Sequence, residues 1–92
     1  MRIYKYELIQ NEPCKAHVGM PLGRKPISVG EQNGKLFVWA EIDEHEELSM
    51  ITWFYVIPTG FNELPDGDIE FIGTVQMSSG LVWHVYWDKD WE

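Results

Sequence analysis

The chain has 92 residues, with 15 acidic side chains against seven lysines and arginines and a formal net charge of −8. A chain of this length forms one domain with a small core, and its hydrophobic content of 45% with 14% aromatic residues excludes a disordered acidic tail. The negative charge repels duplex nucleic acid and anionic lipid. We therefore expect one β domain over residues 1–92, with neither long nucleic acid nor a membrane as a partner.

The sequence has a single cysteine, Cys14, which has no internal partner for a disulfide. No basic start followed by an apolar run marks a secretory signal or a membrane span. We expect a soluble protein of a reducing compartment, the cytoplasm.

Short apolar, aromatic and β-branched runs, separated by Gly, Pro, Asn and Asp, recur about every ten residues, whereas helical periodicity is scarce. This pattern predicts strands near residues 2–8, 16–20, 26–32, 35–42, 50–58, 69–76 and 81–88. Turn residues lie between them at 21–23, 33–34, 58–60, 65–67 and 78–80. We therefore predict an all-β fold, a small antiparallel sandwich or barrel of about seven strands.

The positive charge gathers in the N-terminal third. Residues 1–35 hold six cations against three carboxylates, a net charge of +3, and residues 36–92 hold one cation against twelve carboxylates, a net charge of −11. Arg24 and Lys25 follow Gly23 in a turn between two prolines. The backbone amides of such a turn can bind an anion beside the two cations; the alternative is a solvated turn with two exposed charges.

The strongest local signal is Asn33-Gly34, because this pair supplies the two positive φ angles of a two-residue type I′ hairpin. The turn sets the register, and the predicted facing pairs are Gln32 with Lys35, Gly30 with Phe37 and Ser28 with Trp39 on one face, and Val29 with Val38 and Ile27 with Ala40 on the other. The aliphatic face is the candidate core. Large aromatic residues opposite small ones leave room on the other face for a flat ligand or a partner subunit, unless that face is a second packed layer.

Two further strands are apolar on both faces. In 50–57 one face carries Met50, Phe54 and Val56, and the other carries Ile51, Trp53, Tyr55 and Ile57. In 81–87 one face carries Leu81, Trp83, Val85 and Trp87, and the other carries Val82, His84 and Tyr86. A monomer of this size has too little mass to cover both faces. We therefore expect a homo-oligomer, a dimer or a tetramer.

Three histidines, one cysteine and many carboxylates match no known spacing of a metal site or a nucleophile. His45, between two glutamates, is either a weak metal ligand or part of an exposed acidic loop that favours the protonated ring. His17 and His84 lie among apolar neighbours, as structural histidines do. We predict no catalytic residue, no metal and no cofactor, and hence no enzyme.

Several runs together carry a resemblance: Arg2-Ile3-Tyr4-Lys5-Tyr6-Glu7-Leu8, Gln32-Asn33-Gly34-Lys35 leading to Val38-Trp39-Ala40, Phe71-Ile72-Gly73-Thr74-Val75-Gln76, and Gly80-Leu81-Val82-Trp83-His84-Val85-Tyr86. Their order and spacing resemble a family of small phage-encoded proteins of unknown function. Thr59 and Gly60 match that family's turn after the central strand, Trp83 and His84 match its last strand, and Pro58 stands where glycine is usual. The family looks like the anti-CBASS sponges, oligomeric phage proteins that sequester a cyclic dinucleotide.

The leading hypothesis is therefore a phage anti-defence sponge in the host cytoplasm, which binds a cyclic nucleotide immune signal between aromatic side chains without cleaving it. A small nucleotide avoids the charge objection to long polynucleotides, because a few local donors and aromatic planes hold it. Arg24 and Lys25 are the candidates for phosphate, Trp39, Tyr55 and Tyr86 for the aromatic planes, and Thr59, Thr74 and His84 for hydrogen bonds, with Gly60 in the adjoining turn.

Two other classes of function fit the sequence. The acidic segment can imitate a nucleic-acid backbone and occupy the basic groove of a host defence enzyme, in which case binding weakens steeply with salt. The chain can also be a phage structural or scaffold component.

Overall fold

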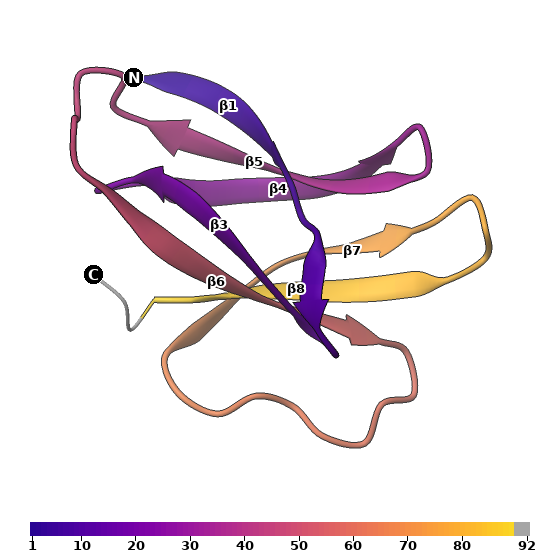
Figure 1. Ribbon diagram of the computed structural model, residues 1–92. Helices are drawn as coiled ribbons and strands as arrows, with labels where there is room; N and C mark the ends of the chain where they lie inside the picture. Colours follow the sequence, from indigo (N-terminus) through magenta and orange to yellow (C-terminus); the bar gives the residue numbers. More distant parts are fainter. Residues whose placement is uncertain (90–92) are drawn as a thin grey trace.

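The computed structural model describes residues 1–89 and contains eight strands and no helix in that range (Figure 1). The strands are β1 (Arg2–Glu7), β2 (Gln10–Glu12), β3 (Lys15–Pro21), β4 (Lys25–Gln32), β5 (Lys35–Ile42), β6 (Ser49–Pro58), β7 (Ile69–Gln76) and β8 (Val82–Asp88).

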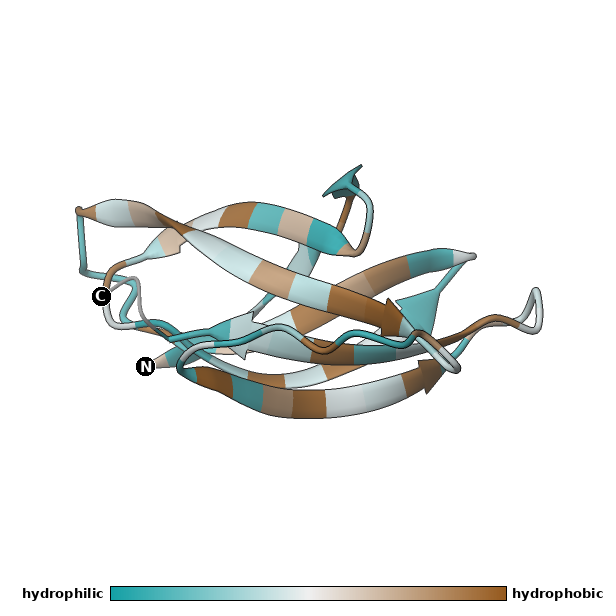
Figure 2. Cartoon of the chain, turned by 90° about the horizontal axis from the view of Figure 1, so that it is seen from below, coloured by the Kyte–Doolittle hydropathy of each residue, from teal (hydrophilic) through white to brown (hydrophobic). Residues whose placement is uncertain are grey.

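The strands form two antiparallel sheets. The first has the order β1-β5-β4 and the second the order β2-β3-β6-β8-β7. The view from below shows the sheets as two layers, with hydrophobic and hydrophilic residues alternating along the strands (Figure 2). The predicted all-β fold is confirmed, and its form is a small sandwich.

All seven predicted strands are present. The eighth, β2, is a three-residue strand with the sequence Gln-Asn-Glu, and it pairs with β3 through an irregular register. Its side chains are all exposed. The sequence pattern missed it because a strand without apolar residues has no alternation to detect.

The hairpin between β4 and β5 is confirmed. Asn33 and Gly34 have φ angles of 53° and 79°, as a type I′ turn requires. Val29 lies opposite Val38, and Gln32 lies opposite Lys35, as predicted.

The predicted pairing of Ile27 with Ala40 is wrong. Pro26 lies opposite Ala40 and Ser28 opposite Trp39, so Ile27 is the extra residue of a bulge between them. Proline has no N–H for the ladder, and it is found in sheets at edges and at bulges. The register predicted from the type I′ turn is therefore correct from the turn to Ser28 and is wrong from Ile27 onward, where Pro26 adjoins the bulge.

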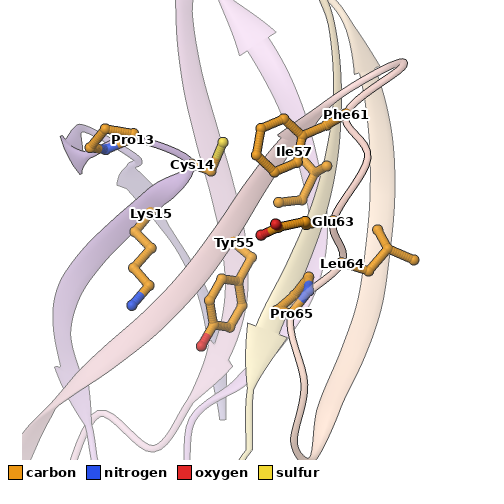
Figure 3. Close-up of a pocket in the computed structure, with 9 residues that line it drawn as sticks. All are labelled: Pro13, Cys14, Lys15, Tyr55, Ile57, Phe61, Glu63, Leu64 and Pro65. Atoms are coloured by element: carbon orange, nitrogen blue, oxygen red, sulfur yellow. The ribbon is translucent and has the colours of Figure 1, made fainter.

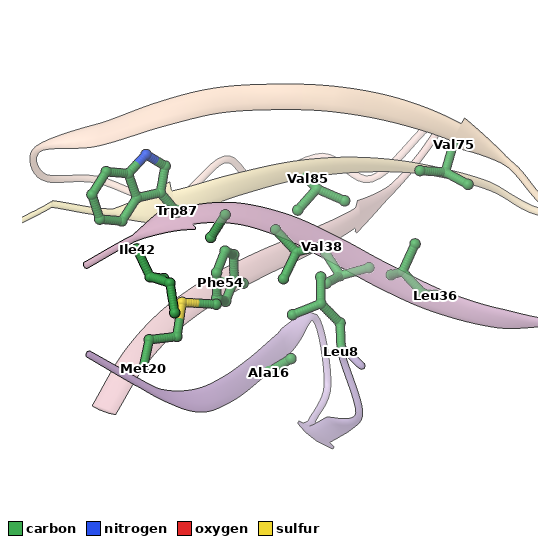
Figure 4. Packing of buried hydrophobic residues seen from close by; sticks show 12 residues of the cluster. Leu8, Ala16, Met20, Leu36, Val38, Ile42, Phe54, Val75, Val85 and Trp87 are labelled. Atoms are coloured by element: carbon green, nitrogen blue, oxygen red, sulfur yellow. The ribbon is translucent and has the colours of Figure 1, made fainter. Parts of the chain in front are cut away.

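The core lies between the two sheets, and its buried side chains come from β3, β5, β6, β7 and β8, with Leu8 after β1 (Figure 4). Val38 from β5, Phe54 and Val56 from β6 and Val85 from β8 have no exposed surface. Val38 and Ala40 of the predicted aliphatic face are thus part of the core. So are Phe54 and Val56 on one face of 50–57, and Val85 and Trp87 on one face of 81–87. The buried hydrophobic cluster comprises Leu8, Ala16, Met20, Leu36, Val38, Ala40, Ile42, Phe54, Val56, Val75, Val85 and Trp87.

Strands β4 and β7 bring the two sheets together along one side. A Cβ added to Gly73 of β7 would lie 3.1 Å from a methyl of Val29 on β4. The Glu31 carboxylate accepts hydrogen bonds from the Ser78 amide at 2.7 Å and from the Ser78 hydroxyl at 3.0 Å.

On β1, Tyr6 packs against the core, and burial raises its pKa, which nearby Tyr4 raises further.

We predict that Phe54→Ala lowers the free energy of unfolding by about 3–5 kcal/mol, because it removes a fully buried ring and leaves a cavity between the sheets. Urea unfolding measures the change. Leu64→Ala is the control, since Leu64 is 65% exposed on a loop, and such a change alters stability by at most about 0.5 kcal/mol. Equal effects of the two substitutions would contradict this placement of the core.

Candidate functional site

The outward face of the five-stranded sheet carries a row of aromatic side chains with a lysine at one end. Across the strands, Lys15 lies opposite Tyr55, Tyr55 opposite Tyr86, and Tyr86 opposite Phe71. Residues that face each other in antiparallel strands point to the same side of the sheet. The Phe71 and Tyr86 rings are 5.3 Å apart between centroids. Three strands therefore present one continuous aromatic row, and β3 adds Lys15 at its end.

Lys15 lies beside two aromatic rings. Its Nζ is 5.8 Å from the ring centroid of Tyr55 and 5.8 Å from that of Trp53, a distance at which a cation is attracted to the ring face. The His17 ring lies 4.9 Å from Trp53. The row thus ends in a cation held over aromatic surface.

A pocket of about 290 Å³ lies between this face and the loop that joins β6 to β7. Lys15 and Tyr55 line its strand side, and Phe61, Glu63 and Pro65 line its loop side; Figure 3 shows the loop side chains across from the strands. The remaining lining residues are Pro13, Cys14, Ile57 and Leu64. This volume is close to the lower limit of about 300 Å³ for small-molecule sites.

The turn before β3 is held against β6 by a backbone hydrogen bond. Cys14 has a φ angle of 62°, which is uncommon for a residue other than glycine. Its carbonyl accepts a hydrogen bond from the Val56 amide at 3.0 Å. This contact places the adjacent Lys15 at the rim of the pocket.

A cluster of three polar side chains lies next to the pocket residue Ile57, although none of the three lines the pocket. His84 Nε2 is 2.8 Å from the Thr59 hydroxyl, and His84 Nδ1 is 3.0 Å from the Thr74 hydroxyl. His84 lies opposite both Thr74 on β7 and the pocket residue Ile57 on β6. A neutral imidazole donates one of these bonds and accepts the other, so the threonine that accepts keeps its own O–H proton. The cluster can offer that proton to a ligand.

The predicted site residues lie in four places in the structure. Tyr55 lines the pocket, and Tyr86, Thr74 and His84 lie on the same outward face. Thr59 and Gly60 begin the loop over the pocket, where Gly60 has a φ angle of 91°. Trp39 lies on the other sheet, and Arg24 and Lys25 lie at the turn between β3 and β4.

The expected space for a flat ligand beside Trp39 is filled by Trp39 itself. A Cβ on Gly30 would lie 3.2 Å from Cζ3 of the indole, so the ring covers the glycine. Phe37 lies 6.5 Å from Trp39 between ring centroids, and Lys5 Nζ lies 4.6 Å from the Phe37 ring. Of the alternatives that the sequence left open for this face, the structure shows a side chain of the same sheet, the indole of Trp39, in the space over Gly30.

The expectation of a solvated turn is wrong for Arg24 and correct for Lys25. Arg24 is only 2% exposed, and its Nε donates a 2.8 Å hydrogen bond to the buried Thr52 hydroxyl. Its guanidinium carbon lies 5.3 Å from the Trp87 ring centroid, and Nη1 lies 3.0 Å from Met50 Sδ. Arg24 therefore stabilises the interior, whereas Lys25 is exposed.

A second pocket of about 360 Å³ lies beside Arg24 and Lys25, but carboxylates line it too. Lys89 Nζ lies 3.4 Å from Glu70 and 4.0 Å from Asp68. A carboxylate, Glu63, also lines the pocket beside Lys15. That pocket is the better candidate because apolar and aromatic side chains, including Tyr55 and Phe61, line most of it.

Sequence reasoning missed Lys15 and Phe61. Lys15 stands one residue before the predicted strand 16–20, and Phe61 lies in a loop 46 positions further along the chain. No local pattern links two residues so far apart. The available signal for an anion site was the positive charge of the N-terminal third, to which Lys15 contributes.

Among residues 1–89, no group of three or more His, Cys, Asp or Glu side chains is placed to hold a metal ion. His45 is 87% exposed and lies 3.8 Å from Glu44. Over the same range, no helix is long and apolar enough to cross a membrane.

Comparison with known families gives one match. Residues 1–92, the whole chain, match a family described as a domain of unknown function, DUF7352. The chain belongs to this family. No curated protein and no solved structure matches the chain.

We predict that Arg24→Ala lowers the free energy of unfolding by about 2–3 kcal/mol, because it leaves the Thr52 hydroxyl buried without its donor. Lys25→Ala is the neighbouring control, for which we expect a change within about 0.5 kcal/mol. Urea unfolding of both variants tests the assignment, and an Arg24→Ala protein as stable as Lys25→Ala would overturn it.

Proposed function

We propose that the protein binds a nucleotide at the pocket beside Lys15 and holds it without cleaving it. The observation that carries the proposal is a cation placed over aromatic rings at the rim of an apolar pocket. A phosphate fits the Lys15 ammonium, and a base fits the face of Tyr55. Side-chain hydrogen bonds come from the cluster of Thr59, His84 and Thr74.

The ligand class that we propose is a cyclic nucleotide. The pocket accommodates one ring system, and the open row of Tyr86 and Phe71 continues from Tyr55 across the next two strands. A second base of a cyclic dinucleotide can stack there. Stacking on an aromatic side chain is worth about 1–3 kcal/mol per base, and a dissociation constant of about 10 nM corresponds to roughly −11 kcal/mol. Two stacked bases supply about 2–6 kcal/mol, and phosphate and hydrogen-bond contacts must supply the rest.

In this proposal the protein is a phage sponge that lowers the concentration of a host immune signal. The phage origin and the anti-CBASS role rest on the strand motifs described above, with Tyr86, Thr74 and His84 of those motifs on the candidate face. Membership of a domain family of unknown function is compatible with this role.

Mimicry of nucleic acid is supported less well. The acidic residues of segment 36–92 fall mainly in two loops, 43–48 and 59–68. These loops lie at opposite ends of the ten-residue strand β6 (Figure 1). A strand of that length spans about 33 Å. Glu44 is also 3.7 Å from Arg2. The acidic side chains therefore do not form one continuous row like a phosphate backbone.

The test is isothermal titration of the protein with a panel of cyclic dinucleotides and trinucleotides, followed by recovery of the ligand. We expect saturable binding of at least one member and intact ligand afterwards. Binding of none of them, or recovery of a hydrolysed product, would overturn the proposal.

The matched variants are Lys15→Glu at the pocket and Lys35→Glu at the exposed hairpin, which change the net charge equally. A hydrogen bond to a charged group is worth about 1.5–3 kcal/mol, so we expect Lys15→Glu to weaken binding at least tenfold and Lys35→Glu to leave it nearly unchanged. Equal losses in both variants would show a general charge effect and remove Lys15 from the site.

A further inference from the structure

Strand β1 is a long sheet edge that is open to solvent. Within residues 1–89 it pairs with β5 on one side, and no strand pairs with its other side. The Arg2 side chain is 66% exposed, Ile3 is 58% exposed and Tyr4 is 42% exposed. An unpaired edge presents a row of backbone donors and acceptors to any strand that can reach it.

The other sheet edges are short or covered. Strand β4 lies against β7, through Gly73 with Val29 and through Glu31 with Ser78, and β2 has only three residues with an irregular register. Strand β1 contains no proline, glycine or bulge over Arg2–Glu7. Proline and bulges are devices that proteins use to block edge pairing, and β1 has neither; its charged residues are Arg2, Lys5 and Glu7.

One hydrogen bond shows which groups of β1 are available. The Leu8 amide donates to the Leu36 carbonyl at 2.8 Å. Along an antiparallel strand, successive residues direct their backbone groups to alternate sides, so the even-numbered residues point to β5. The N–H and C=O groups of Ile3, Lys5 and Glu7 therefore point to the open side.

Two copies related by a two-fold axis can pair these groups. A two-fold axis perpendicular to the sheet keeps the outward faces of both copies on the same side. Facing residues must then point to the same side of the sheet, so both have odd numbers or both have even numbers. With Tyr4 on the axis, Ile3 of each copy exchanges both backbone hydrogen bonds with Lys5 of the other copy. The outward-pointing groups of both strands are then satisfied.

The side chains are self-complementary in this register. Arg2 of one copy lies opposite Tyr6 of the other, and the two Tyr4 rings face each other across the axis; cation–aromatic and aromatic pairs are favourable across strands. Placing the axis one residue later, on Lys5, sets two ammonium groups opposite each other, which is unfavourable. Of these two axes, the side-chain pattern favours the one on Tyr4.

We propose that β1 pairs antiparallel with β1 of a second copy, with Tyr4 on the two-fold axis, to form a dimer with one continuous six-stranded sheet. The pairing uses the three-stranded sheet, so it leaves the pocket face of both five-stranded sheets open. It does not depend on the proposed ligand.

Directed cross-linking tests the register. The test uses a Cys14→Ser background. In the proposed register, Tyr4→Cys places the two new thiols opposite each other at a pair that exchanges no backbone hydrogen bonds. The Cα atoms of such a pair lie about 4.5 Å apart, a distance that a disulfide can bridge. Ile3→Cys is the matched control, since its two Cα atoms lie more than about 8 Å apart in the same register. Under mild oxidation we expect a covalent dimer from Tyr4→Cys and little from Ile3→Cys. Equal cross-linking, or none from Tyr4→Cys, would overturn the register.

The mass in solution tests the dimer itself. We expect the unmodified protein to have twice the chain mass of 10.8 kDa. Ile3→Pro removes an outward N–H without removing a β1–β5 hydrogen bond, so we expect a monomer with an unchanged circular dichroism spectrum. A monomeric unmodified protein, or a folded Ile3→Pro protein that remains dimeric, would overturn the proposal.

Discussion

The alternation of side chains along β6 is the constraint on which the rest of the structure depends. Phe54 and Val56 point inward and have no exposed surface, while Tyr55 points outward to the pocket. Because the side-chain period of a strand is two, a slip of one residue in register would exchange the core for the candidate site. The inward packing of Phe54 and Val56 therefore also fixes the position of Tyr55 beside Lys15 and Tyr86.

The positive charges of the N-terminal third have different physical roles, and burial separates them. Arg24 lies in the interior, where it donates to Thr52 and contacts Trp87. Lys15 lies at the rim of an apolar pocket over two rings. A guanidinium presents several donors in a fixed plane and suits a buried network, whereas an ammonium on a flexible chain suits a surface phosphate contact. The candidate anion site in the structure is therefore at the start of β3, and not at the turn of Arg24 and Lys25 that the sequence favours.

The two sheets divide the surface between them. The five-stranded sheet presents the aromatic row, the pocket and the Thr59–His84–Thr74 cluster on its outward face. The three-stranded sheet ends in β1, whose open edge fits a second copy of the chain. Ligand binding and self-association, as proposed, use different faces and can occur together.

The sequence by itself determined the all-β class, the seven longer strands and the Asn33-Gly34 hairpin, because period-two alternation and positive φ angles are local properties. It also indicated that 50–57 and 81–87 are apolar on both faces, without deciding which face points outward. Only the tertiary structure decided that Trp39 covers Gly30, that Arg24 is buried, and that a loop brings Phe61 to the same pocket as Lys15. Those contacts join residues distant in the chain or on different strands, and their formation depends on how the strands pair and how the two sheets pack.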